Sequence, residues 1–279
     1  MYFDIRINPP STMAPNPPHW GGYQKYLPHE ANLAPYENQP FSKFVDMLDK
    51  AGVSRGMLIV GPNATLEDQP PHIKGLLDQY PGRFVGAVTI RPQPNLLDAM
   101  KQIERAKEFG MRAIVVRPFE AQLFANDRRF YPIYAKAAEL GMVVSLVVGM
   151  NFSDRPNLEF SSPVPVDSVA SEFPSLKIIM THSGWPWSAE AVAVAWKHAN
   201  VYIDVSGIRP RYLAMEGAGY EPFFRFGNSI LQDKLLWGTD WPLTDPAKTI
   251  EEIKELPLKE EVKEKWLYKN AMKLFDLKD

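Results

Sequence analysis

Short apolar runs recur along the whole chain, and most of them are followed by a turn and a helix-like segment. The eight runs lie at 2–7, 56–60, 83–90, 112–116, 142–148, 177–181, 201–205 and 234–237. Amphipathic segments between them predict helices, of which the clearest lie at 41–51, 95–109, 131–140 and 189–198. This alternation predicts parallel strands joined by crossover helices, and eight such units predict a (β/α)8 TIM barrel in the α/β class. The 279 residues suit one barrel, whose usual length is about 250 residues.

A doubly wound open sheet would give a similar alternation, but no G-x-G-x-x-G motif follows the first run. We therefore expect a single barrel domain over 1–279. A loop at 9–40 contains eight prolines, so it cannot form a regular element, and it follows the first strand onto the carboxyl-end face. It is either a lid or a loop packed on the barrel. At the other end we expect a charged surface helix at 251–265 and a final outer helix at 266–277.

The composition excludes several classes of function. Lys and Arg number 31 against 33 Asp and Glu, so the net charge of −2 would not attract nucleic acid or an anionic membrane. The chain has no cysteine, which excludes thiol nucleophiles, disulfides and cysteine metal sites. It has neither a secretory leader pattern nor an apolar run near the roughly 20 residues that span a bilayer, so we expect a cytoplasmic protein.

Two of the predicted strands, at 2–7 and 201–205, alternate apolar and polar residues up to and just beyond their ends. Successive strand residues point to opposite faces, so we expect the apolar set to face the helices and the polar set to face the lumen. Barrel interiors are mostly apolar, and an unpaired buried charge costs several kcal/mol. These polar residues therefore form either a structural ion-pair network or a site at the carboxyl ends of the strands. They are Asp4, Arg6, Asn8, Asp204 and Ser206.

Two further strand ends carry residues suited to acid–base chemistry. The sixth run ends in T-H-S-G-W-P-W and the eighth in W-G-T-D-W-P, which places His182 and Asp240 at the carboxyl-end face. Histidine titrates near neutral pH and is the commonest general acid or base, so we favour this role for His182, with a buried core histidine as the alternative. The neighbouring Trp185, Trp187 and Trp241 would give the pocket apolar walls.

Arginine precedes proline at three strand ends, at Arg91, Arg117 and Arg209. Guanidinium groups bind carboxylates through two parallel hydrogen bonds, so arginines at one mouth would form an anion site. We favour Arg117 and Arg209 for this role, with surface ion pairs as the alternative. The other histidines are expected at the surface, at a helix end or in the proline-rich loop: His72, His198, His19 and His29.

Four elements together resemble a known family: Asp4 in the first strand, T-H-S-G-W-P-W at 181–187, V-Y-I-D-V-S-G at 201–207 and L-L-W-G-T-D-W-P-L at 235–243. They are similar to the amidohydrolase-related TIM-barrel family of the amidohydrolase superfamily. That family includes aminocarboxymuconate-semialdehyde and resorcylate-type decarboxylases and pyrone dicarboxylate lactonases. The resemblance spans nearly the whole chain and implies the same barrel.

Metal-dependent members of that family carry His-x-His at the end of strand one, a histidine ending strand five and an aspartate ending strand eight. This chain has Arg6, Asn8 and Val147 at the three histidine positions and keeps Asp240 and the acid/base histidine, His182. The resemblance thus implies the barrel and the pocket without the metal, and we predict no cofactor. Since strands one and eight are neighbours, Arg6 should lie beside Asp240 and supply the missing positive charge.

Three functions remain open. The first is a metal-independent hydrolase of a small carboxylated substrate, perhaps aromatic or a lactone, because the resemblance to the lactonases casts Asp240 as the water-activating base and His182 as its acid/base partner. The second is a decarboxylase of small aromatic acids, and the third is a non-catalytic barrel that binds a small acid or a partner. A homodimer is compatible with all three. The residues predicted to bind substrate are Arg6, Asn8, Arg117, Arg209, Trp185 and Trp241.

Overall fold

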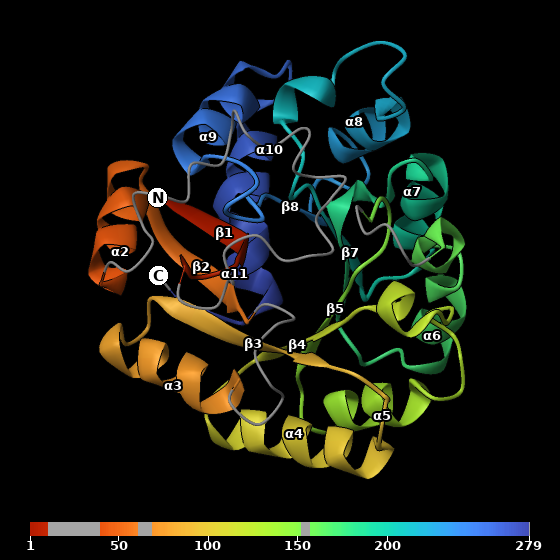
Figure 1. The fold of residues 1–279 in the computed structure, drawn as a ribbon. Coiled ribbons are helices and arrows are strands. Elements are labelled where there is room, and N and C mark those ends of the chain that lie inside the picture. The colour runs from red at the N-terminus through yellow and green to blue at the C-terminus, as the bar shows by residue number, and fades with distance from the viewer. Residues whose placement is uncertain (11–39, 61–68, 152–156, 279) are drawn as a thin grey trace.

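The structure, a computed structural model, describes residues 1–10, 40–60, 69–151 and 157–278. Within these residues, eight parallel strands follow one another in the order β1 to β8, which confirms the predicted (β/α)8 barrel (Figure 1). The strands are β1 Tyr2–Ile7, β2 Val53–Ile59, β3 Phe84–Ile90, β4 Ala113–Val116, β5 Val143–Leu146, β6 Ile178–Met180, β7 Val201–Asp204 and β8 Leu235–Leu236.

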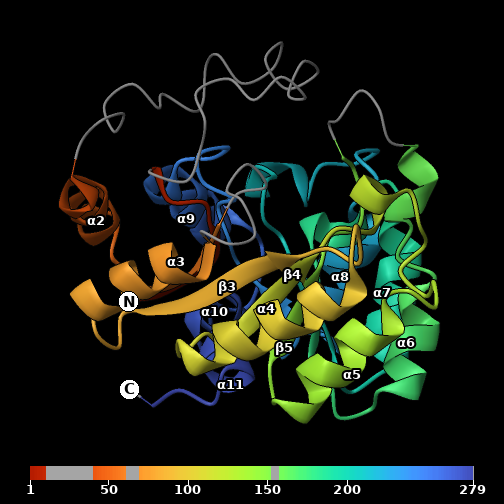
Figure 2. The same ribbon diagram turned by 60° about the horizontal axis from the view of Figure 1, so that its bottom comes forward.

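Helices pack around the strands of the barrel (Figures 1 and 2). They are α2 Phe41–Lys50, α3 Gln69–Gln79, α4 Leu96–Glu108, α5 Tyr131–Glu139, α6 Val166–Glu172, α7 Ser188–Lys197, α8 Glu221–Gly227, α9 Pro246–Glu255, α10 Glu260–Glu264 and α11 Asn270–Leu274. Local signals account for their ends: the Asn95 side chain caps α4 by accepting from Leu97 N–H at 2.9 Å, and Gly110 follows the helix with φ +80°.

The single helix predicted at 251–265 is wrong, because the structure has two helices there. The first, α9, begins at Pro246 and ends before Leu256, which is extended (φ −61°, ψ 143°) and precedes Pro257. Proline disfavours the helical conformation of the residue before it, so the chain breaks at this point and restarts as α10. A π-helical turn over Lys265–Lys269 then leads into α11. The single outer helix predicted at 266–277 is also wrong, because residues of α11 pack in the inner apolar cluster with β1.

Two apolar layers follow the alternation of the strands. Residues such as Leu58, Ile114 and Val144 pack outward against the helices, whereas Met57, Val115 and others at alternate positions fill the lumen. The first strand departs from the expected pattern. Its register against β2 shifts twice, and Phe3 and Ile5 belong to the inner cluster together with residues of α11, while Ile7 joins the outer layer.

The barrel closes between β1 and β8 through a few contacts rather than a full ladder. Ile5 N–H donates to the Trp237 carbonyl at 3.1 Å, and Asn8 N–H donates to the Trp241 carbonyl at 3.1 Å. The Trp237 N–H instead donates to the carbonyl of Trp266, at 2.9 Å, so the C-terminal helices reach the same seam. This seam brings the polar residues of β1 next to those that follow β8.

None of the helices in the described ranges is long and apolar enough to cross a membrane. The prediction for the loop at 9–40 falls almost entirely outside the described residues, as do His19 and His29 and the side chain of His72.

Candidate active site

The two predicted acid/base residues are held in an unusual backbone conformation at the ends of their strands. His182 follows β6 with φ +56°, and Asp240 follows β8 with φ +48°. Non-glycine residues seldom adopt this left-handed conformation, and such strain is concentrated at functional sites. Backbone hydrogen bonds hold both turns: His182 N–H donates to Asp204 Oδ1 at 2.9 Å, and the Asp240 carbonyl accepts from Leu243 N–H at 3.0 Å.

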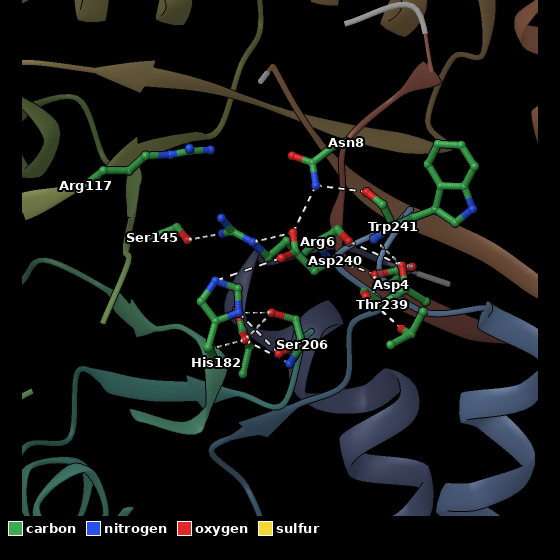
Figure 3. A network of polar contacts seen from close by, with 12 residues as sticks. Asp4, Arg6, Asn8, Arg117, Ser145, His182, Ser206, Thr239, Asp240 and Trp241 are labelled. Atoms are coloured by element: carbon green, nitrogen blue, oxygen red, sulfur yellow. Dashed lines mark hydrogen bonds and ion pairs between the residues drawn. The ribbon is translucent and has the colours of Figure 1, made fainter. Parts of the chain in front are cut away.

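The Asp240 carboxylate is paired as the sequence predicted. Its Oδ1 accepts from Arg6 Nε and from Asn8 Nδ2, each at 2.9 Å, and the groups are buried together (Figure 3). Burial alone would raise the pKa of Asp240, but the charges of Arg6 and His182 and the Asn8 hydrogen bond outweigh it, so the pKa lies below its usual range. The expected neighbourhood of Arg6 and Asp240 is therefore confirmed.

The second carboxylate oxygen of Asp240 faces His182, with 4.0 Å between Oδ2 and Nε2. The other ring nitrogen, Nδ1, lies 3.2 Å from both the carbonyl oxygen and the hydroxyl of Ser206. A carbonyl oxygen only accepts hydrogen bonds, so the neutral ring carries its proton on Nδ1 and leaves Nε2 bare. Burial and, second, the Arg6 charge lower the pKa of His182 below its usual value, and the charge of Asp240 opposes them. The ring is therefore neutral at pH 7.

Arg6 also spans the lumen, since its Nη1 lies 3.5 Å from the hydroxyl of Ser145 on the opposite strand β5. Asp4, two residues earlier, fixes the turn after β8. Its Oδ1 accepts from Thr239 N–H at 2.9 Å, and its Oδ2 accepts from the Thr239 hydroxyl at 2.6 Å. Complete burial raises the pKa of Asp4 to about 7, which these hydrogen bonds only partly oppose. Three of the five polar residues predicted in the lumen, Asp4, Arg6 and Asn8, thus join β1 to the segment that follows β8.

Arg117 follows β4, and its side chain extends toward Asn8 across the site (Figure 3). Nη1 donates to Glu120 Oε1 at 3.1 Å, and Glu120 Oε2 accepts from Arg91 Nη2 at 2.9 Å. The buried Nε of Arg117 has no partner among the described residues. Burial lowers the pKa of Arg117, and the charge of Glu120 opposes this shift. The Arg117 side chain thus carries a buried guanidinium with an unused N–H donor toward the site.

Three of the residues predicted to bind substrate lie elsewhere or are engaged differently. The Arg209 guanidinium forms a buried ion pair with Glu252 on α9, with Nε donating to Oε2 at 2.9 Å. The Trp241 ring packs on Phe44 of α2 with centroids 4.6 Å apart and points away from Arg6 (Figure 3). The Trp185 indole N–H donates to a backbone carbonyl, at 3.0 Å.

Gly207 lies in the site, although no sequence pattern predicts a role for it. It has φ +71°, and a Cβ there would lie 3.2 Å from His182 Nδ1 and 3.5 Å from Asp240 Oδ2. Glu120, which accepts from Arg91 and Arg117, is a second residue of this kind. Its spacing of three residues from Arg117 was the available signal, whereas nothing local predicts the space that Gly207 leaves.

Comparisons with known proteins agree with this fold. The sequence profile of the amidohydrolase family matches residues 75–277, and the chain therefore belongs to that family. Protein fluG of Emericella nidulans is 28% identical over 107 residues, which cover 38% of this chain and 12% of that protein. The chain thus spans a small part of this relative's length.

Two solved structures illustrate the similarity over nearly the full length. An uncharacterized TIM-barrel protein from Bordetella bronchiseptica has a TM-score of 0.82 and 25% identity, covering 99% of this chain and 98% of that chain. A dihydroxybenzoic acid decarboxylase from Polaromonas, solved with bound manganese and the inhibitor 2-nitroresorcinol, has a TM-score of 0.71 and 15% identity. The alignment covers 99% of this chain and 96% of that one, and at this identity the likeness shows the fold alone.

The residues that the structure describes do not fit a divalent metal. A stable site takes three or four ligands, and within the described residues no group of three or more His, Cys, Asp or Glu side chains is arranged to hold an ion. The Asp240 carboxylate, which faces His182, already carries a guanidinium 2.9 Å from its Oδ1. A second cation at Asp240 would meet the charge of Arg6 at close range.

Proposed function

We propose that this chain is a hydrolase of small carboxylated esters or lactones whose water is activated by Asp240 and His182 together, without a metal. The observation that carries the proposal is the pairing of Asp240 Oδ2 with the bare Nε2 of His182, 4.0 Å apart at the carboxyl ends of β8 and β6. Both atoms are acceptors, so they suit the two hydrogens of one water molecule.

Asp240 and His182 would have different roles toward the water molecule. Arg6 and Asn8 keep Asp240 ionised and lower its pKa, so its carboxylate orients the water but is a weak base. Burial lowers the pKa of His182, so its ring is neutral, and an imidazole is ordinarily a stronger base than a carboxylate, which makes Nε2 the better acceptor of the proton. The water oxygen would bond to the substrate carbonyl carbon, and the imidazolium would return the proton to the leaving oxygen as the ester bond breaks.

Positive charge around this pair supports a carboxylated substrate. Arg117 extends toward the site with an unused donor and would bind the substrate carboxylate, while Arg6 lies where it can stabilise the oxyanion. Glu120 holds Arg117 in place and offsets only part of the local charge, since Arg91 bonds the same carboxylate.

The test is hydrolysis of lactone and ester mono- and dicarboxylates by protein of measured metal content, in the presence of a chelator. We expect activity that survives chelation, falls by about 10²–10⁴-fold in Asp240→Asn and in His182→Gln, and is unchanged in Asp98→Asn, an exposed carboxylate on α4. Activity that disappears with the chelator, or that Asp240→Asn retains, would contradict the proposal.

A carboxy-lyase is the second candidate, supported by the similarity in fold to the dihydroxybenzoic acid decarboxylase. The same panel, extended to hydroxylated benzoic acids, separates the two because a lyase releases carbon dioxide and a hydrolase consumes water at an ester bond. Binding of these acids in a thermal-shift screen without turnover of any would instead support a non-catalytic barrel.

A further inference from the structure

We propose that Asp204 and Ser206 are positioning residues that fix the His182 ring with its proton on Nδ1 and its Nε2 open toward Asp240. The inference deepens the proposed function and rests on it for the role of His182, but the arrangement itself can be tested without a substrate. Asp204 ends β7 and Ser206 lies two residues beyond it, next to the strand that carries His182.

The direction of each hydrogen bond follows from the chemistry of its partners. The Ser206 hydroxyl lies 2.6 Å from Asp204 Oδ1, and since a carboxylate only accepts, the hydroxyl donates to it. The lone pairs of that hydroxyl then face His182 Nδ1 at 3.2 Å, beside the Ser206 carbonyl at the same distance. Both oxygens therefore accept from an N–H at Nδ1. A neutral ring protonated on Nε2 has no such N–H and would make neither hydrogen bond.

Asp204 Oδ1 also accepts hydrogen bonds from the backbone near the His182 ring. Asp204 Oδ1 accepts from His182 N–H at 2.9 Å and from Ser206 N–H at 3.0 Å, in addition to the hydroxyl. One oxygen thus anchors the left-handed backbone of His182 and, through Ser206, its ring. Asp204 is 1% exposed and Ser206 is fully buried, so water does not compete for these bonds.

The charge of Asp204 has a second consequence. Its Oδ2 is buried and has no partner among the described residues, so the carboxylate is not neutralised by a cation there. Among the described residues, the charged groups that act most on the ring are Arg6, which opposes protonation, and Asp240 and Asp204, which favour it. As His182 takes a proton from water, the Ser206–Asp204 chain would stabilise the imidazolium and help the transfer.

The test is nuclear magnetic resonance of protein labelled with ¹⁵N in histidine, titrated with pH, with the His182 signals assigned by their loss in His182→Gln. We expect the wild-type ring to be protonated on Nδ1. Ser206→Ala should lower the pKa of the ring by about one pH unit or less and mix the tautomers, because one acceptor for the imidazolium is lost. Asp204→Asn should lower it further, since the charge is lost as well.

Ser183→Ala is the matched control, because Ser183 is buried next to His182 in the chain and its hydroxyl has no partner among the described residues. We expect its His182 signals to match those of the wild type. A wild-type ring protonated on Nε2 would overturn the inference, and this needs no variant to fold. The inference would also be overturned if the His182 ring in Ser206→Ala had the same pKa and the same tautomer as in the wild type.

Activity separates this inference from the proposed function. If the proposed hydrolysis is found, Ser206→Ala should shift the acid limb of the kcat profile in step with the ring pKa and leave KM near its wild-type value. If the spectra agree with the expectation but no ester or lactone is hydrolysed, the proposed function fails and the positioning of His182 stands. If the spectra disagree while hydrolysis persists, only the positioning fails.

Discussion

A buried carboxylate is tolerated where its charge is compensated, and Asp240 receives this compensation from Arg6 Nε and Asn8 Nδ2 at 2.9 Å each. Arg6→Ala should therefore destabilise the protein by about 3–5 kcal/mol at pH 7, because it leaves the carboxylate unpaired. Its pKa should also rise. Urea unfolding at pH 5, 6 and 7 measures the free energy of unfolding, and spectroscopic titration of the site measures the pKa.

The pH dependence has a definite sign. The pKa of Asp240 is depressed in the folded wild type, so pairing stabilises the protein above the unfolded carboxyl pKa and is lost as the pH falls through the folded value. In Arg6→Ala the cost should be largest at neutral pH and shrink as Asp240 takes up a proton. Adding Asp240→Asn should restore much of the stability. Wild-type stability and an unchanged Asp240 pKa in Arg6→Ala alone would show that Arg6 does not compensate this charge.

The space between the acid/base groups depends on a missing side chain at Gly207. Gly207→Ala places a Cβ 3.2 Å from His182 Nδ1, and we expect hydrolysis to fall by about 10²-fold through displacement of the ring. Gly217→Ala is the control, since Gly217 has a similar φ of +78° with nothing within 4 Å of the added Cβ. In both variants the left-handed backbone should lower the free energy of unfolding by about 1–2 kcal/mol, but only Gly207→Ala should lose activity. Equal activity in the two variants would contradict the role of this space.

At the scale of elements, Asp4 ties β1 to the turn after β8, and its raised pKa of about 7 predicts a pH effect. The folded state keeps a proton on Asp4 between about pH 4 and 7, so this group makes the free energy of unfolding fall as the pH rises. Asp4→Asn removes the titration and can keep the bonds to Thr239, since its amide accepts at Oδ1 and donates to the hydroxyl. Its stability relative to wild type should thus rise by up to about 4 kcal/mol from pH 4 to 8.

Asp127→Asn provides a control of opposite sign, because Arg129 holds the pKa of Asp127 at about 2. This pair is largely solvated, so the variant should lose at most about 1 kcal/mol relative to wild type as the pH rises through the unfolded carboxyl pKa. Urea unfolding from about pH 2 to 8, which covers the titration of both carboxyl groups, measures both variants. A pH profile of Asp4→Asn parallel to that of wild type would mean that Asp4 titrates normally.

The sequence predicted the strands and the Arg6–Asp240 pair because period-two alternation and strand order are local or topological properties. It could not predict that Arg209 turns to Glu252, 43 residues away, or that the Trp241 ring packs on Phe44. Both outcomes depend on which outer helix reaches a given strand end. Strand ends were uncertain for a related reason: β8 is only Leu235–Leu236, since Trp237 N–H bonds the C-terminal helices instead of a strand.

For the molecule as a whole, the weak ladder between β1 and β8 makes the C-terminal helix part of the barrel rather than an appendage. Phe3 of β1 stacks on Phe275, directly after α11, with ring centroids 5.9 Å apart, and Leu274 is fully buried in the same inner cluster. Leu274→Ala should therefore cost about 2–5 kcal/mol in the free energy of unfolding. The matched change Leu97→Ala, at a residue 70% exposed on α4, should stay within about 0.5 kcal/mol of wild type.

The seam between β1 and β8 also positions Asp240. Leu274→Ala should therefore loosen the hydrogen bonds of this seam as well as lower the free energy of unfolding. Chemical denaturation followed by tryptophan fluorescence measures the free energy, and amide hydrogen exchange locates the change. We expect faster exchange in Leu274→Ala at the amides of Ile5 and Asn8, which donate across the seam, and little change at Val144 in the regular ladder on the far side. Exchange that accelerates only within α11, with the seam amides as protected as in wild type, would show that the helix merely covers a barrel closed by its own strands.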